Sequence, residues 1–162
     1  MGCIVSFGGF LPIGMLTLAF LIVAAPLLGP RAGGMVGYWL LSCVGVAYVG
    51  AAFAPCDLGC PSPPTSPRQL LHNLLGILEY AGGGVGLLVF AGGYFQRRPD
   101  RVARIVLFAS GAAALGVFVG IATPGLEAWH GLIQWVGEAA LFGSLVLIGW
   151  RLARPESGWS AA

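Results

Sequence analysis

Five long apolar runs limit what this chain can fold into. Each holds roughly the 20 apolar residues that an α-helix needs to cross the hydrocarbon core of a bilayer, and none shows the alternation of a barrel strand. We therefore predict spans at residues 7–28, 35–54, 70–95, 102–122 and 126–152. No basic residue precedes the first run, so we expect this run to be retained rather than removed as a secretory signal.

The low charge of the chain also indicates a membrane protein. Of 162 residues, 57% are hydrophobic and only 9% are charged, whereas a soluble domain carries about 25% charged residues. The sequence thus predicts an all-α fold, a polytopic transmembrane helical bundle that forms one integral-membrane domain over residues 1–162, with the lipid bilayer as its partner. The formal net charge of +2 gives no indication of nucleic-acid binding.

The basic residues, which are all arginines, predict how the chain lies in the membrane. If the five spans alternate in direction, only Arg68 falls on one side of the bilayer. The other side receives Arg31, Arg97, Arg98, Arg101, Arg104, Arg151 and Arg154. Because short loops rich in arginine stay cytoplasmic, we expect the C-terminus and residues 96–101 to be cytoplasmic and the loop 55–69 to be outside.

Two of the predicted spans carry a histidine near the outer boundary and a glutamate about 16 Å deep, near the midplane. These pairs are His72 with Glu79 in the third span and His130 with Glu138 in the fifth. His72 and Glu79 are seven residues apart, which returns the chain to nearly the same helix face. In the fifth span, Gln134 lies between the two ionisable residues at intervals of four.

A charged side chain at the bilayer centre costs several kcal/mol unless it is paired, protonated or hydrated. We therefore predict a polar pocket between the third and fifth spans, open to the outside, with Glu79 and Glu138 sharing a proton at its floor. The alternative is a buried hydrogen-bond network that only fixes helix register. Asp57 completes the candidate ligand-binding residues, because we expect its stiff Pro-rich loop to cover the mouth of the pocket beside His72. The alternative is that this loop is a plain surface linker.

Cys56 and Cys60 lie in the same outer loop, on the side where disulfides persist. A disulfide between them is one interpretation; free thiols, metal binding and redox catalysis are others, although the spacing is not the CxxC of thioredoxin-like oxidoreductases. Ser66 is expected to cap the third span, with Pro67 as its first residue.

The two histidines raise the possibility of a metal or a b-type haem. Neutral imidazole binds Zn, Cu or Fe, and His72 and His130 are predicted at matched depth on different helices. They are the only histidines, however, and no HxxxH or HExxH pattern is present. The sequence assigns no catalytic residue. Our first expectation is that the protein has no cofactor, and a metal or haem is the alternative.

Small residues predict close packing between helices. Gly82–Gly84 and Gly86 lie in the middle of the third span. Gly116 with Gly120 and Ala139 with Gly143 repeat a four-residue spacing in the fourth and fifth spans.

Three segments resemble a bacterial membrane family known as domain of unknown function 998. They are "FAPCDLGCP", "LLHNLLG" and "GLIQWVGEAALFGSLVLIGWRL", in that order. The resemblance covers most of the chain and implies a bacterial inner-membrane protein with no established activity. Family members usually have six spans, so the resemblance implies that this chain lacks the first, either as a truncated product or as a shorter variant.

These observations favour an integral membrane protein that binds or moves a small ligand, ion or lipid. A membrane-embedded redox, metal or haem enzyme that uses His72, His130 and the outer cysteines is an alternative. A purely structural or assembly subunit is another. The sequence indicates neither the ligand nor the oligomeric state.

Overall fold

The structure is a computed structural model that describes residues 2–28, 32–58, 60, 63–94 and 100–153. The described residues form helices joined by turns and contain no strand. In chain order the elements are α1 (Gly2–Val5), the π-helix η1 (Ser6–Phe10), α2 (Leu11–Ala24), the 3-10 helix η2 (Ala25–Leu28), α3 (Ala32–Leu40), α4 (Ser42–Phe53), α5 (Pro67–Ile77), the π-helix η3 (Leu78–Gly82), α6 (Gly83–Tyr94), α7 (Arg101–Ala122), the 3-10 helix η5 (Glu127–Trp129) and α8 (His130–Ala153).

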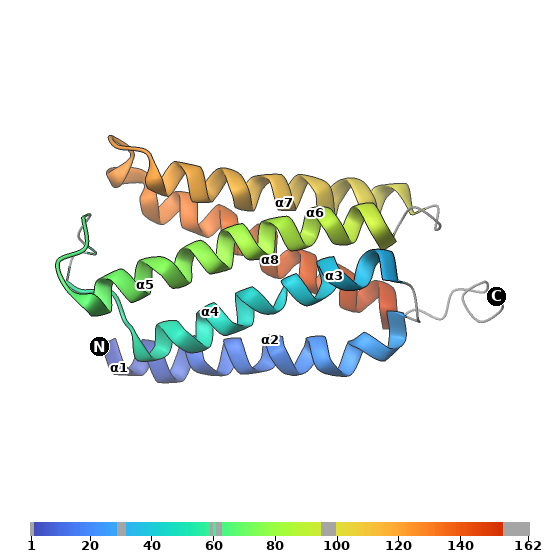
Figure 1. Ribbon diagram of the computed structural model, residues 1–162, viewed down its shortest axis with the longest axis horizontal. Helices are drawn as coiled ribbons and strands as arrows, with labels where there is room; N and C mark the ends of the chain where they lie inside the picture. Colours follow the sequence, from blue (N-terminus) through green and yellow to red (C-terminus); the bar gives the residue numbers. More distant parts are fainter. Residues whose placement is uncertain (1, 29–31, 59, 61–62, 95–99, 154–162) are drawn as a thin grey trace.

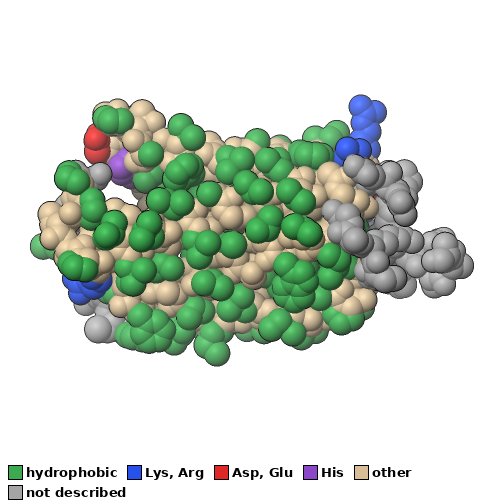
Figure 2. Space-filling view, in the orientation of Figure 1, with side chains coloured by type: hydrophobic (Ala, Val, Ile, Leu, Met, Phe, Trp, Pro, Cys, Tyr) green, Lys and Arg blue, Asp and Glu red, His purple; other side chains and the backbone are tan. Residues whose placement is uncertain are grey.

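These elements join into five long helices that lie side by side as a bundle (Figure 1). Five segments are long and apolar enough to cross a membrane: Ser6–Leu28, Gly34–Phe53, Pro67–Tyr94, Arg101–Ala122 and Glu127–Ala153. Apolar side chains are spread over the flank of the bundle, whereas the charged side chains visible in Figure 2 lie at its ends. The predicted all-α membrane bundle of five spans is confirmed.

The two ends of the bundle carry different groups. One end, called here the Cys end, holds Cys56 in the loop between α4 and α5, and the turn between α7 and η5 (Figure 1). The opposite end, called the arginine end, holds the start of α7 with Arg101 and the end of α8 with Arg151. Several arginines used for the orientation lie outside the described residues, namely Arg31, Arg97, Arg98 and Arg154.

Polar side chains set where two of the helices begin. Ser66 Oγ accepts a hydrogen bond from Gln69 N at 3.0 Å, which confirms the predicted cap of α5. Asp100 Oδ1 caps α7 by accepting from Ala103 N at 3.0 Å. The other oxygen of Asp100 lies 2.8 Å from Arg151 Nη1, so the start of α7 is joined to the end of α8.

Glycines let neighbouring backbones approach each other closely. A Cβ on Gly37 of α3 would lie only 2.2 Å from Phe90 N of α6. A Cβ on Gly14 of α2 would lie 2.7 Å from Gly45 O of α4. A side chain at either glycine would collide with backbone, so these helix pairs depend on having none there.

The predicted glycine run of the third span packs in the same way. Gly84 lies against α7, where a Cβ would come 3.0 Å from Gly111 O. The close helix contacts predicted at Gly116 of α7 and Gly143 of α8 were wrong. Nothing among the described residues lies within 4 Å of a Cβ built on either glycine. Both glycines are exposed on the outer faces of their helices, so the spacing alone does not produce a contact.

Helix α8 runs obliquely to α2 and thereby leaves space inside the bundle. It packs along α7, and at the arginine end it reaches α2, where a Cβ on Gly149 would lie 3.1 Å from the ring of Phe20 (Figure 1). Toward the Cys end the two helices diverge, and Ile13 of α2 and Gln134 of α8 lie on opposite walls of one cavity.

We expect Gly37→Ala to lower the free energy of unfolding by about 1–3 kcal/mol, the usual cost of overpacking, because the added methyl group meets backbone. Gly116→Ala is the matched control: its Cβ meets nothing, and alanine is favoured over glycine in a helix by about 0.5–1 kcal/mol. Thermal unfolding of both variants in detergent measures the difference. A Gly37→Ala protein as stable as the wild type would contradict the close contact.

Candidate functional site

A cavity of about 680 Å³ lies inside the half of the bundle that ends at the Cys end. Residues from the first, second, third and fifth spans line it, and so do Pro55, Cys56 and Cys60 of the loop. Small-molecule sites in proteins typically have volumes of about 300–1,000 Å³, so the cavity is large enough to hold a small organic molecule. The cavity is larger than the pocket predicted between the third and fifth spans, because the first and second spans also line it.

Four of the six predicted ligand-binding side chains line this cavity: His72, Glu79, Gln134 and Glu138. The predicted faces of the third and fifth spans therefore do meet. His130 and Asp57 are not among the lining residues.

The place of His130 is taken by Gly131. Gly131 precedes Glu138 by seven residues, about 700°, and so points in nearly the same direction, whereas His130 is turned away by about 80°. Nothing lies within 4 Å of a Cβ on Gly131 or on Gly76, which both line the cavity. These two glycines leave open space on the walls formed by α5 and α8.

Glu138 is held by two tyrosines from other spans. Tyr48 Oη of α4 donates to Glu138 Oε2 at 2.5 Å, and Tyr80 Oη of η3 donates to Glu138 Oε1 at 3.0 Å. Each carboxyl oxygen thus accepts a hydrogen bond, which offsets part of the cost of burying this group. The hydroxyl hydrogens of both tyrosines are used in these bonds.

Sequence reasoning missed both tyrosines. A signal for Tyr80 exists at Gly137, because a Cβ there would lie 2.6 Å from Tyr80 Cε1. Gly137 therefore provides the space in which the ring of Tyr80 reaches Glu138. For Tyr48 the sequence carries no comparable signal; its ring packs edge-on against Phe10 and Phe142, with centroids 5.5 and 5.2 Å away.

Glu79 lies in a π-helical turn, η3, in the middle of the third span. Single π turns inside α-helices occur frequently at functional sites. The carboxyl groups of Glu79 and Glu138 lie close enough to interact directly. Glu79 Oε1 is buried and accepts no hydrogen bond from the described residues. Two adjacent carboxyl groups at this depth require a compensating positive charge, either a shared proton or a bound cation.

The two histidines are in different surroundings. His72 Nδ1 lies 3.0 Å from the carbonyl oxygen of Ala54; because a carbonyl only accepts, Nδ1 carries the hydrogen. His130 Nε2 is buried and has no hydrogen-bond partner among the described residues. Within the described ranges, no three His, Cys, Asp or Glu side chains are grouped so that they could hold a metal ion.

Asp57 stabilises the loop that covers the cavity. Its carboxylate accepts hydrogen bonds from Ser66 Oγ and from the Arg68 guanidinium, whose Nε lies 3.1 Å from Oδ1. These bonds, that from Ser66 first, lower the pKa of Asp57, so the group is ionised at neutral pH. Asp57 therefore joins the loop to the start of α5, outside the cavity lining.

Gln69 is the other polar residue that holds the loop, and it was not predicted. Its side chain is 1% exposed, and its Oε1 accepts from Asp57 N at 2.7 Å. Its Nε2 donates to Asn73 Oδ1 at 2.8 Å. Cys56 Sγ lies 3.3 Å from Gln69 Oε1, and Cys56 is bonded to Cys60 with 5.4 Å between their Cα atoms. The disulfide thus lies at the mouth of the cavity.

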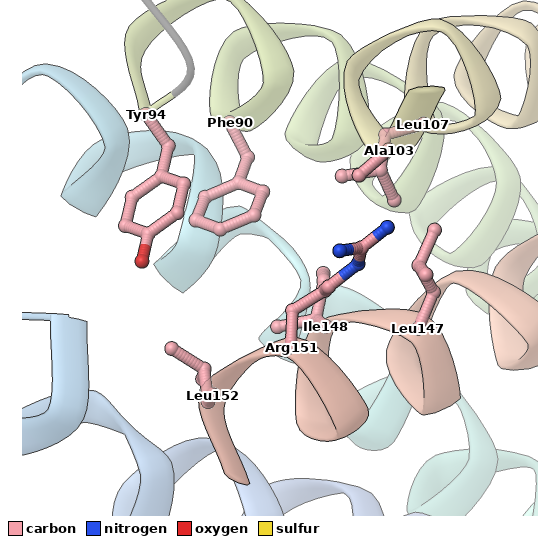
Figure 3. Close-up of a pocket in the computed structure, with 8 residues that line it drawn as sticks. All are labelled: Phe90, Tyr94, Ala103, Leu107, Leu147, Ile148, Arg151 and Leu152. Atoms are coloured by element: carbon pink, nitrogen blue, oxygen red, sulfur yellow. The ribbon is translucent and has the colours of Figure 1, made fainter. Parts of the chain in front are cut away.

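Two other hollows lack the features of a ligand site. Figure 3 shows Arg151 pointing into a pocket at the arginine end, between Phe90 of α6 and Leu107 of α7. With a volume of about 10 Å³ it has room for one water at most. A groove of about 460 Å³ between α2 and the end of α8 is lined only by apolar side chains and Gly149.

The geometry defines the class of protein as an α-helical membrane protein with a carboxyl-lined cavity. Residues 4–151 match the model of a family described as "Protein of unknown function (DUF998)". The chain belongs to this family, and the resemblance inferred from the three sequence segments is confirmed. No curated protein and no solved structure matches the chain.

Replacement of Asp57 should have a pH-dependent effect on stability. The folded-state pKa of Asp57 is below its ordinary value, so its contribution is present above the unfolded pKa of about 3.9 and is lost as pH falls through the folded pKa. We expect Asp57→Asn to have a lower thermal midpoint than the wild type at pH 7, and the gap to close below about pH 4. A gap of constant size from pH 7 to pH 3 would contradict this role.

The tyrosines should couple energetically to Glu138. We expect Tyr48→Phe to lower the free energy of unfolding by about 1–3 kcal/mol, because a buried carboxyl oxygen loses its donor. In the background of Glu138→Ala the same replacement should have little effect, since no acceptor is left there. Thermal or denaturant unfolding of the two single variants and the double variant measures the coupling. Additive effects would show that the hydrogen bond contributes little.

Proposed function

We propose that this protein binds a small molecule or ion in the cavity between the first, second, third and fifth spans. The observation that carries the proposal is the position of Glu79 and Glu138, two interacting carboxyl groups on the wall of a cavity of about 680 Å³. Ionisable residues inside a membrane protein are rare and mark ligand, ion or proton pathways.

The surroundings of the carboxyl groups support binding over a purely structural network. A structural network would satisfy its members within the bundle, as the tyrosines do for Glu138. Glu79 Oε1, by contrast, lacks a hydrogen-bond donor among the described residues. Gly76 and Gly131 keep the neighbouring walls open instead of filling them.

We also propose that the chain lies in a bacterial cytoplasmic membrane with the Cys end outside and the C-terminus in the cytoplasm. Arg101, Arg104 and Arg151 lie toward the arginine end of the bundle, and Arg68 lies at the Cys end. This asymmetry supports the orientation, because arginines near the ends of spans favour the cytoplasmic side. The mouth of the cavity, beside Cys56 and Cys60, then opens outward.

A cysteine placed on the cavity wall tests both the cavity and the orientation. In a chain with Cys3→Ala and Cys43→Ala, we expect Gly76→Cys to react in intact cells with a membrane-impermeant methanethiosulfonate. Gly76 has open space beside it within the cavity, so water and the reagent reach it from outside. Mass spectrometry of the purified protein measures the extent of modification.

Gly116→Cys is the control for this experiment, because Gly116 also has open space beside it but lies on the outer face of α7. In lipid, the Gly116→Cys variant should remain unmodified. Gly116 lies about 9 Å from the end of its helix at 1.5 Å per residue, so it is nearer the Cys end than Gly76 is. Modification of Gly76→Cys only after the membrane is permeabilised would reverse the orientation. If Gly76→Cys stays unmodified in both conditions, the cavity is closed and the proposed function is wrong.

A further inference from the structure

The groups that line the cavity restrict the charge of its ligand. Of its lining residues, which all belong to the described ranges, Glu79 and Glu138 are the acidic ones, and none is an arginine. The chain contains no lysine. The guanidinium of Arg68, the arginine of the Cys end, is bonded to Asp57 outside the lining. The lining thus holds two carboxyl groups and one imidazole, that of His72, and a carboxyl pair that shares one proton carries one negative charge.

The hydrogen-bonding groups show the same preference. Tyr48 and Tyr80 donate their hydroxyl hydrogens to Glu138, so each hydroxyl oxygen is left to act only as an acceptor toward a ligand. The Nδ1 hydrogen of His72 is directed to Ala54 O. Glu79 Oε1 also lacks a donor among the described residues. The amide of Gln134 and the indole N–H of Trp135, which line the cavity as well, are able to donate. These two groups are neutral, whereas the carboxyl groups are acceptors that carry charge, so the lining suits a ligand that donates hydrogen bonds or carries positive charge better than an anion.

The walls fit an organic group better than a metal ion held by many protein ligands. Ca²⁺ takes six to eight oxygen ligands, and no cluster of three or more His, Cys, Asp or Glu side chains exists among the described residues. Instead, aromatic side chains from four spans line the cavity: Phe10, Tyr48, Tyr80, Trp135 and Phe142. Aromatic faces attract desolvated organic cations, and aromatic cages are a common means of binding quaternary ammonium groups.

We propose that the ligand of this cavity is an organic cation, a protonated amine or quaternary ammonium with apolar substituents. Its charge lies against Glu79 and Glu138, and its apolar part packs against the aromatic walls. The inference rests on the proposed function, because it assumes that the cavity is a binding site. Soluble amines and amines carried on an alkyl chain in the bilayer share this chemistry.

The first measurement compares two reagents of opposite charge at Gly76→Cys in purified protein. The trimethylammonium-ethyl and sulfonato-ethyl methanethiosulfonates differ mainly in the charged group that they bring into the cavity. The rates of both reagents at Thr65→Cys, on the exposed loop, serve as the reference. Relative to that variant, Gly76→Cys should react about tenfold faster with the cationic reagent than with the anionic one, since negative clefts raise the local concentration of cations by such factors. Glu79→Gln should reduce this preference toward that of the loop.

The second measurement keeps both carboxyl groups and therefore does not depend on a variant that fails to fold. Phenyltrimethylammonium should slow the modification of Gly76→Cys several-fold, whereas its neutral isostere tert-butylbenzene and the anion benzoate should not. In phosphatidylcholine vesicles, protection by added stearylamine would identify a membrane-borne amine as the source, and protection by phenyltrimethylammonium alone would identify a soluble one.

The outcomes separate the two proposals. The cation inference is overturned if Gly76→Cys shows the same ratio of cationic to anionic reaction rates as Thr65→Cys and phenyltrimethylammonium gives no protection. The open cavity would still stand in that case. Equal protection by tert-butylbenzene would likewise overturn it, because the charge would then contribute nothing. If Gly76→Cys reacts with neither reagent, the cavity is closed and the proposed function itself fails.

Discussion

Two carboxyl groups buried inside an apolar helical bundle set the requirements that the rest of this structure meets. Removing a carboxylate from water costs several kcal/mol, and lipid supplies no hydrogen bonds in return. The bundle supplies some of them through Tyr48 and Tyr80, which reach Glu138 from the second and third spans. The same bonds join the fifth span to the second and third spans, which are distant from it in the chain. The polar cluster therefore stabilises the arrangement of spans that its burial would otherwise oppose.

The close glycine contacts and the oblique α8 together explain why a cavity survives inside so small a bundle. Gly14 lets α2 approach α4 closely, and Gly37 lets α3 approach α6 closely. These two helix pairs therefore pack tightly. Helix α8 closes onto α2 only near Phe20 and Gly149. At the Cys end the space between α2 and α8 is covered by aromatic side chains and by the loop that Gln69 and Asp57 hold in place.

The fold and much of the site could be predicted because bilayer thickness and helix rise are fixed lengths. Counting residues from the outer boundary placed Glu79 and Glu138 at the same depth, and both line one cavity. The same counting included His130, which lies about 80° away from the face of Glu138. Spacing at intervals of four drifts around a helix, and only packing decides which member of the series faces inward.

What could not be predicted depends on side-chain contacts between spans. Tyr48 looks like any aromatic residue of a membrane helix until α8 is placed beside it, and Gln69 looks like a polar residue near a helix start. Asp57 was expected at the cavity, yet Ser66 and Arg68 hold its carboxylate in the loop. The glycine pattern of α7 and α8 misled for a related reason, since spacing carries no information about which face a partner covers.

The π-helical turn η3 separates the register of the site from that of the packing. An α-helix advances 100° per residue, and a π turn absorbs one extra residue within a continuous helix. Glu79 and Tyr80 belong to this turn, and the glycines that contact α7 and α3, Gly84 and Gly86, come directly after it. Deleting one residue of the turn would restore an uninterrupted α-helix, so the glycines would keep their neighbours while Glu79 or Tyr80 changed direction. A single deletion in this segment would therefore remove the site from a descendant of this chain and leave the assembly of its helices in place.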